Sequence, residues 1–312
     1  MRRPHGIWRI LGWGAAAFLA VALLPSAAYA WTPGTHIFLG DAVLGSLGNL
    51  PHAVADLLRA FPYDFLYGSI AADTSIAKKY APAGRHCHSW TVGLEIHDRA
   101  RDDRLRAFGL GYLAHLAADV VAHNFFVPRY LVLASKTSGL GHSYWETRFE
   151  THLGEGYSRR ARAVIMRDHG RSDAHLDRIL SPTIFSTHTN RRIFRGMVYV
   201  TDTDSWQRIF QLAAENSRWD LADDEVASYL ARSYDYIMDL LKRAERSEPF
   251  ALDPAGDEAL RLAVQVRRDA RRSGVRYRVP EAARHFRMPT SSLPFAAALP
   301  APIYPAARAE ND

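Results

Sequence analysis

Three residues with metal-ligand side chains recur at four-residue spacing in the segment 109–126, GLGYLAHLAADVVAHNFF. They are His115, Asp119 and His123. In an α-helix these positions lie along one stripe, each turned only ~40° from the last. Polar side chains are costly to bury in so apolar a helix unless something satisfies them, and a metal ion does so. The alternative that spacing alone leaves open is a hydrogen-bonded polar seam between helices.

A second pair of this kind follows in GHSYWET, where His142 and Glu146 stand four apart on one helical face. The alternative reading is an exposed ion pair, worth only tenths of a kcal/mol. Further candidates lie upstream in WTPGTH, GSIAADTS and RHCHSW. Any one of them is an ordinary residue by itself, and the order of the whole series is the specific signal. These upstream candidates are His36, Asp73, His86 and His88.

The first thirty residues have the three parts of a secretory signal: a basic start, an apolar run over about 11–24 and a small-x-small end. We therefore expect cleavage after Ala30 and a secreted or periplasmic protein. A retained anchor helix is the alternative, although the run is shorter than the roughly 20 residues of a membrane span. Cleavage would give Trp31 a free α-amine beside its own carbonyl, and these two atoms can chelate a zinc ion.

The remaining elements are predicted to be almost wholly helical, because apolar residues recur at three- and four-residue spacing and no sustained period-two alternation is present. We expect a catalytic domain over 31–250, a basic helical extension over 251–288 and a mobile tail over 289–312. Cys87 is the only cysteine, which excludes an intrachain disulfide. Proline and glycine residues, among them Pro62, Gly68 and Pro128, are expected to mark breaks between the helices. The expected helices are about 36–47, 51–60, 94–107, 109–126, 141–153, 157–168, 205–217, 222–243 and 254–270.

With these residues in this order, the sequence resembles the zinc-dependent phospholipase C family, strongly over about 31–150. The resemblance implies an all-α domain around three clustered zinc ions and hydrolysis of a phosphodiester, with Asp73 orienting or deprotonating the attacking water. One zinc would take Asp73, His88, His115 and Asp119. A second would take Trp31, His36 and the shared Asp119. The third would take His123, His142 and Glu146.

Two departures bear on the substrate. The third helix ligand comes four residues after Asp119, as in the glycosylphosphatidylinositol-specific phospholipase D relatives, whereas secreted bacterial phospholipases C use six. The trinuclear zinc nucleases share this ligand order, but their last pair normally ends in Asp where this chain has Glu146. We therefore expect a phospholipid substrate, with cleavage of single-stranded nucleic acid as the alternative. His86 in place of His88 and Cys87 as a further ligand also stay open, and a non-catalytic zinc-stabilised binding protein is a third function class.

Charge argues against a nucleic-acid partner. Loss of residues 1–30 removes three arginines and no acidic residue, so 39 basic and 33 acidic residues become 36 and 33. Between Arg261 and Arg287 nine arginines face only two acidic residues, a bias that would draw the protein to an anionic membrane surface. A solvated arginine-rich helix is the alternative. We expect a monomer.

Overall fold

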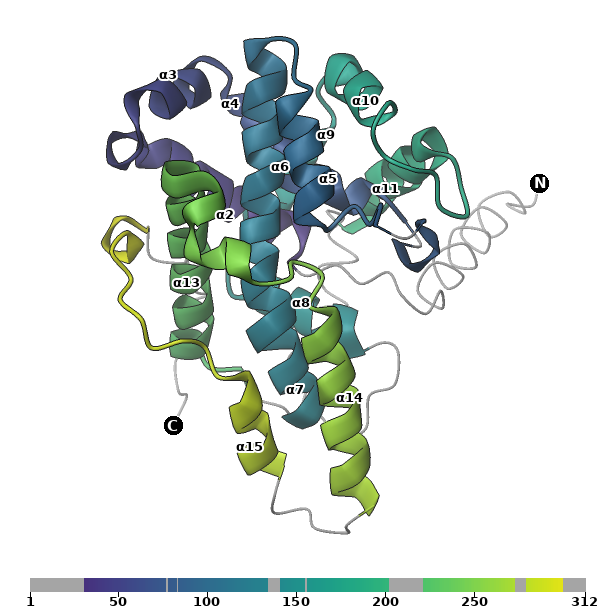
Figure 1. Ribbon diagram of the computed structural model, residues 1–312, viewed down its shortest axis with the longest axis vertical. Coiled ribbons are helices and arrows are strands. Elements are labelled where there is room, and N and C mark those ends of the chain that lie inside the picture. Colours follow the sequence, from purple (N-terminus) through teal and green to yellow (C-terminus); the bar gives the residue numbers. More distant parts are fainter. Residues whose placement is uncertain are drawn as a thin grey trace, which may run out of the picture.

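A long buried helix, α6 (Asp103–Val121), runs through the middle of the molecule (Figure 1) and carries two of the predicted ligands. The computed structural model describes residues 31–299 except 77, 83, 134–140, 155, 202–220 and 273–278. Every regular element in these described ranges is helical, so the all-α prediction is confirmed. The signal segment 1–30, the predicted helix 205–217 and the last part of the predicted tail lie outside the described residues.

Helices of the main body surround α6, with α4, α5 and α13 packed directly against it (Figure 1). Some of the short turns matter for the site: the 3₁₀ turns η2 (Ala72–Thr74) and η3 (Lys78–Tyr80), and the π-helical turn η4 (Ala122–Phe126). The α-helices besides α6 are α2 (Pro33–Gly45), α3 (His52–Ala60), α4 (Pro62–Ala71), α5 (Trp90–Asp98), α7 (Val127–Leu133), α8 (Gly141–Thr151), α9 (Gly156–Ile165), α10 (Gly170–Leu176), α11 (Thr187–Thr201), α13 (Asp223–Arg243), α14 (Asp257–Arg272) and α15 (Val279–Ala282).

Two glycines let α4 and α6 cross at very short distance. A Cβ added to Gly68 would lie 2.1 Å from the Phe108 carbonyl oxygen, and one added to Gly111 would lie 2.1 Å from that of Phe65. No side chain fits at either position. This crossing brings η2, at the end of α4, alongside the ligand stripe of α6.

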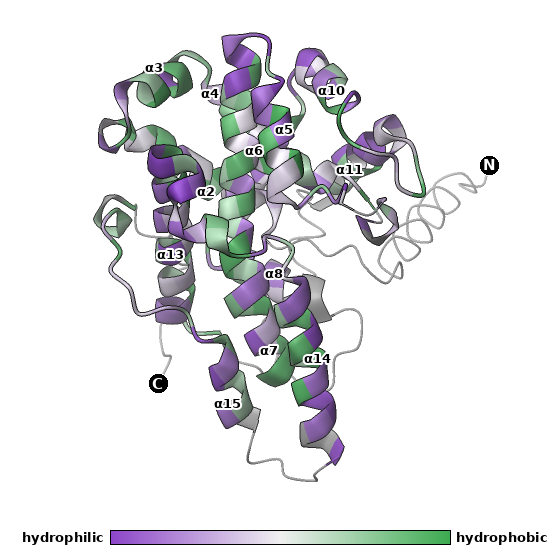
Figure 2. Ribbon diagram, in the orientation of Figure 1, coloured by the Kyte–Doolittle hydropathy of each residue, from purple (hydrophilic) through white to green (hydrophobic). Residues whose placement is uncertain are grey.

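The helix continues from α6 through η4 into α7, and this run of 31 residues is long and apolar enough to cross a membrane. Within its most apolar window, however, 89% is buried inside the protein. The alternation of hydrophobic and hydrophilic residues along the surrounding helices (Figure 2) agrees with a core helix rather than a span.

Beyond the main body, α7, α14 and α15 form a projection (Figure 1) with a small core of its own, centred on Val132, Ala263 and Phe286. Residues 289–299, predicted to begin a mobile tail, lie against α13 instead. Arg232 donates to the Pro289 carbonyl oxygen at 2.8 Å, and the Phe295 amide donates to Asp235 at 2.9 Å. Proline and alanine composition alone did not show that α13 offers these partners.

Candidate metal centre

Five predicted ligands from four parts of the chain meet in one buried cluster. His36 comes from α2, Asp73 from η2, His88 from the turn before α5, and His115 and Asp119 from α6. None of the five is more than 2% exposed. These side chains are polar and the surrounding core is apolar. Their burial costs free energy unless hydrogen bonds, opposite charges or a bound metal ion satisfy them.

Asp119 is the centre of the cluster. Its Oδ1 lies 3.3 Å from His36 Nε2, and its Oδ2 lies 3.0 Å from His88 Nε2 and 3.1 Å from His115 Nε2. Among the described residues, no hydrogen bond of acceptable geometry reaches either oxygen. Three imidazoles therefore face one carboxylate without the directional contacts that would satisfy it. This arrangement fits ligands that surround a cation better than a hydrogen-bonded seam.

The hydrogen bond made by Nδ1 of His115 shows which of its ring nitrogens can bind a metal ion. His115 Nδ1 lies 2.9 Å from the Ser69 carbonyl oxygen, which can only accept, so Nδ1 carries the hydrogen. In the neutral tautomer with this hydrogen, the lone pair is on Nε2, which lies 3.0 Å from His88 Nε2. A backbone partner on the outer nitrogen is the usual orienting contact of a histidine that binds metal.

Among the described residues, three sets of ligand atoms are close enough to share an ion. One is His86, Cys87 and His88, and the other two lie in the cluster that contains Asp73 and Asp119. His36, His115 and Asp119 form one of these two, and Asp73, His88 and His115 form the other; within each set the ligand atoms lie within 4.8 Å of one another. Mixed imidazole and carboxylate donors without thiolate suit zinc. The described residues of the two sets in the cluster thus fit two neighbouring metal positions.

Trp31 lies beside these positions. Its side chain is fully buried, its Nε1 donates to the Ala118 carbonyl oxygen at 3.0 Å, and its ring packs 4.1 Å from that of Phe149. Ala118 immediately precedes Asp119, so the side chain of the first residue of the expected mature chain is fixed to the backbone of α6 one residue before the shared carboxylate. Coordination by its α-amine stays a prediction.

His123 lies in the π-helical turn η4, so the predicted α-helical stripe does not extend regularly to it. Its Nδ1 donates to the Pro254 carbonyl oxygen at 2.6 Å. Burial lowers the pKa of His123 to about 4, which keeps the ring in the neutral form that binds metal. Gly256 makes this contact possible: a Cβ there would lie 2.5 Å from the His123 backbone oxygen.

Glu146 is 1% exposed and lies near the other carboxylates. Burial, followed by the charges of Asp73 and Asp119, raises the pKa of Glu146 well above its usual value. Buried carboxylates that lie close together repel one another when they are ionised, and cations bound between them would relieve this repulsion. His142 lies in α8, and its side chain is outside the described part of the structure. The third predicted set is therefore described only through His123 and Glu146.

The structure brings His88, and not His86, next to Asp73 and Asp119. His86 Nδ1 accepts the His88 backbone amide at 3.1 Å. The Cys87 sulfur contacts the outer nitrogen of the His88 ring, with Sγ 3.2 Å from Nδ1, while the Nε2 of His88 faces the cluster. His86 thus contacts the backbone of His88, and Cys87 contacts the ring that enters the centre.

Lys78 is a residue of the cluster that the sequence did not predict. It lies on η3 and is 5% exposed, and its Nζ donates to Asp73 Oδ1 at 2.8 Å. Burial alone would lower the pKa of Lys78, but Asp73 and then Cys87 hold it above its usual value, so the amine stays charged. A lysine in a short turn belongs to no helical pattern, which is why spacing could not single it out.

Comparison with known proteins agrees with this geometry. The family model described as zinc dependent phospholipase C matches residues 35–192, about half of the chain, and this stretch contains every predicted ligand except Trp31. Searches among curated proteins and among solved structures returned no match. The resemblance inferred from the ligand order is confirmed, and the chain belongs to the zinc-dependent phospholipase C family.

Proposed function

We propose that this protein is a zinc-dependent phosphodiesterase that hydrolyses phospholipids. The observation that carries the proposal is the contact of three imidazoles with the buried carboxylate of Asp119, at 3.0–3.3 Å. A centre that only stabilised the fold would need four closed ligands. The convergence of five described ligands, one of which is the shared carboxylate, exceeds that need and favours catalysis.

Zinc ions held there would stabilise the charge of an in-line phosphoryl transition state and lower the pKa of a water molecule from 15.7 towards ~7. Asp73 is the residue we assign to orienting that water or accepting its proton. Its Oδ1 lies 3.4 Å from His88 Nε2 and 4.0 Å from His115 Nε2, at the edge of the ligand cluster. The other oxygen, Oδ2, has no hydrogen-bond partner among the described residues and is available for this role.

We extend the proposal to three zinc ions per chain, with the third bound by His123, His142 and Glu146. The burial of Glu146 and the neutral state of His123 support it. We also propose export and cleavage after Ala30, supported by the signal-like composition of residues 1–30 and by the hydrogen bond of Trp31 to the carbonyl oxygen of Ala118, the residue before Asp119.

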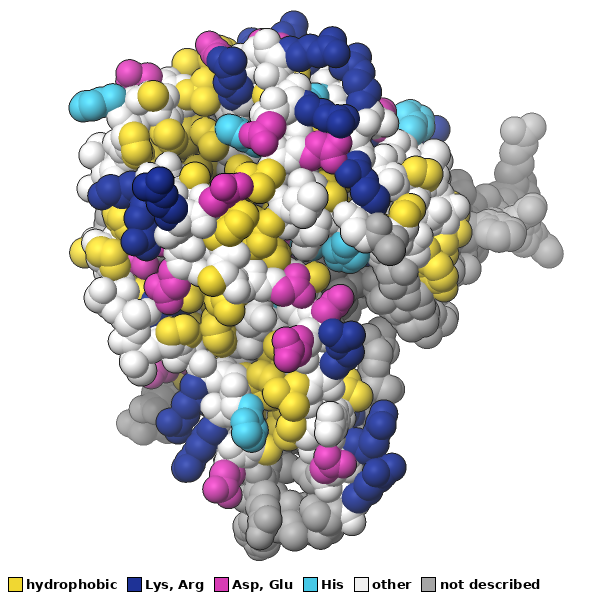
Figure 3. Space-filling view, viewed as in Figure 1, with side chains coloured by type: hydrophobic (Ala, Val, Ile, Leu, Met, Phe, Trp, Pro, Cys, Tyr) yellow, Lys and Arg dark blue, Asp and Glu magenta, His cyan; other side chains and the backbone are white. Residues whose placement is uncertain are grey.

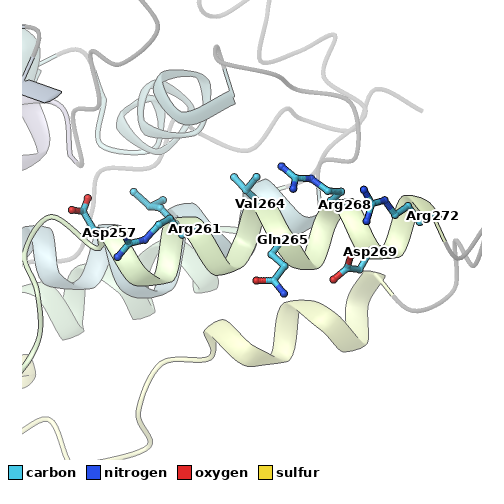
Figure 4. A pocket seen from close by; sticks show the side chains of 8 residues that line it. Asp257, Arg261, Val264, Gln265, Arg268, Asp269 and Arg272 are labelled. Carbon is cyan, nitrogen blue, oxygen red and sulfur yellow. The ribbon is translucent and has the colours of Figure 1, made fainter.

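Peripheral contact with an anionic membrane is proposed for the projection. Lys and Arg side chains lie on both sides of its end (Figure 3), and α14 carries Arg261, Arg268 and Arg272 along a groove of about 630 Å³ (Figure 4). Asp257 and Asp269 also line this groove, so three arginines and two acidic residues face it and its net charge is about +1. Basic residues near an anionic surface contribute about 1 kcal/mol each.

The test uses mature protein that begins at Trp31, reconstituted with zinc. Phospholipid vesicles and single-stranded DNA and RNA are offered to the same preparation, and the released phosphorylated head group or nucleotide is measured. We expect product from phospholipid, removal of activity by a chelator and recovery with zinc. Efficient digestion of nucleic acid without product from any phospholipid would instead assign the protein to the nuclease class.

A further inference from the structure

Lys78 is a cation placed inside a cluster of metal ligands. Its Nζ lies 2.8 Å from Asp73 Oδ1 and 3.1 Å from His88 Nε2. These are two of the atoms that are expected to bind the first zinc ion. The side chain is 6% exposed, so it enters the cluster from within the protein rather than from solvent.

The ammonium and a zinc ion cannot both hold these positions. Asp73 Oδ1 and His88 Nε2 are 3.4 Å apart. An ion about 2.0–2.1 Å from each of them would fall within roughly 4 Å of Nζ, and two positive charges at that distance in a buried site repel strongly. When zinc binds, Lys78 must therefore leave Asp73 and His88 while its backbone stays on η3.

The displaced ammonium then needs another anion within reach. Asp73 and Asp119 are both committed to metal in the loaded centre. The Glu146 carboxyl and the Cys87 thiol lie within electrostatic range of the ammonium. The third predicted zinc would take Glu146, and the thiol contacts the His88 ring. A phosphodiester bound to the metal ions would bring a new negative charge to this place. Because an ammonium is a compact point charge with three donors, it binds phosphate oxygens readily.

Resting on the function proposed above, we infer that Lys78 is a substrate-binding residue of the zinc-loaded centre and that its ammonium binds a non-bridging oxygen of the substrate phosphate. In the metal-free protein the same ammonium compensates Asp73. Lys78 would thus hold the charge of the site in balance before zinc binds and would recognise phosphate afterwards.

The experiment measures zinc content and phosphate affinity on the same mature proteins. Wild type, Lys78→Met, Lys78→Arg and Lys242→Met are loaded with zinc; Lys242 is exposed on α13 and serves as the control. Zinc per chain is determined by elemental analysis, and inorganic phosphate binding by calorimetry. Circular dichroism checks that each variant is folded.

We expect Lys78→Met to bind at least as much zinc as wild type but to bind phosphate roughly tenfold to a hundredfold more weakly, the range of a charge-assisted hydrogen bond. Lys78→Arg should keep most of the phosphate affinity, and Lys242→Met all of it. With substrate, Lys78→Met should raise KM more than it lowers kcat. Unchanged phosphate affinity in Lys78→Met, or loss of zinc from it, would overturn the inference. If phosphate binding depends on Lys78 and yet no phospholipid is cleaved, only the proposed function fails.

Discussion

Replacing Asp119 with Asn should damage the centre more than any other single substitution. The side chains have nearly the same shape, so the packing around α6 is kept while the negative charge is lost. Asp119 faces His36 on one oxygen and His88 and His115 on the other. The change therefore weakens both metal positions that the described residues form.

The magnitude follows from the ligand count. Apparent binding energies of about 10–16 kcal/mol for four-ligand zinc sites correspond to roughly 2.5–4 kcal/mol per ligand, or about 10²- to 10³-fold in affinity. At free zinc 1,000 times the wild-type Kd, each site stabilises the fold by about 4.1 kcal/mol. A hundredfold weaker site contributes only about 1.4 kcal/mol under the same conditions, so two sites together lose about 5 kcal/mol.

The assay is urea unfolding of wild type and Asp119→Asn, each with buffered zinc and with chelator, together with zinc content. The difference between the two proteins should be large with zinc and much smaller without it. Asp98→Asn, at a side chain that is 70% exposed, is the matched control and should unfold like wild type in both conditions. Equal zinc content and an equal zinc-dependent gain in stability for Asp119→Asn would refute the role assigned to this carboxylate.

Three further predictions concern the residue Trp31, the glycine beside His123 and a buried histidine outside the predicted ligand set. A protein that keeps a few residues ahead of Trp31 should bind less zinc than one that begins at Trp31, because the α-amine becomes an amide; equal zinc in both, with start sites verified by mass spectrometry, would remove this residue from the ligand set. Gly256→Ala should destabilise the fold by about 1–2 kcal/mol and weaken zinc binding, since φ is +61° and a Cβ would lie 2.5 Å from that of His123; Gly45→Ala, where nothing lies within 4 Å, is the control, and equal thermal unfolding of the two variants would contradict the contact. Burial lowers the pKa of His169 below 6.5, so its contribution to stability is complete above that pH and is lost as pH falls below it; in chelator, His169→Gln should show a smaller drop in unfolding free energy between pH 7.5 and pH 5.5 than wild type, and equal drops would show that this histidine does not set the pH dependence.

The all-helical fold and the ligand helix were predictable because apolar periodicity and a four-residue polar stripe are local properties. The residues at which the helices begin and end were less predictable. We expected helices over 94–107 and 109–126, whereas α5 ends at Asp98 and α6 begins at Asp103. The reason is a cap: the Asp102 side chain accepts the Leu105 amide at 3.0 Å and starts a new helix there.

Proline and glycine misled the prediction in two places. Pro128 was expected to end the helix, but the π-helical turn η4 precedes it and the helix continues as α7. Gly68 was also interpreted as a break, but it lies inside α4 and permits the close crossing with α6. Such tertiary reasons are not visible in a single sequence. Pro62 does mark a boundary, as expected, because α3 ends at Ala60 and Pro62 occupies the first turn of α4, where its missing N–H costs nothing.

For the centre itself, sequence order predicted which residues meet but not which partner each would find. The resemblance favoured His88 over His86, and the structure places the His88 ring next to Asp119, whereas His86 Nδ1 accepts the His88 backbone amide. Lys78 could not be found at all, because its importance comes from the spatial position of η3 next to Asp73 and not from any spacing. Charged residues that enter a site from an irregular turn have no periodic signature.

The most direct test of the central claim is the zinc content of the mature, tag-free protein after reconstitution, measured on the same preparation that is assayed with phospholipid vesicles. The account predicts about three zinc ions per chain and zinc-dependent release of a phosphorylated head group or diacylglycerol. One zinc ion or fewer per chain, in a folded protein that begins at Trp31, would contradict it.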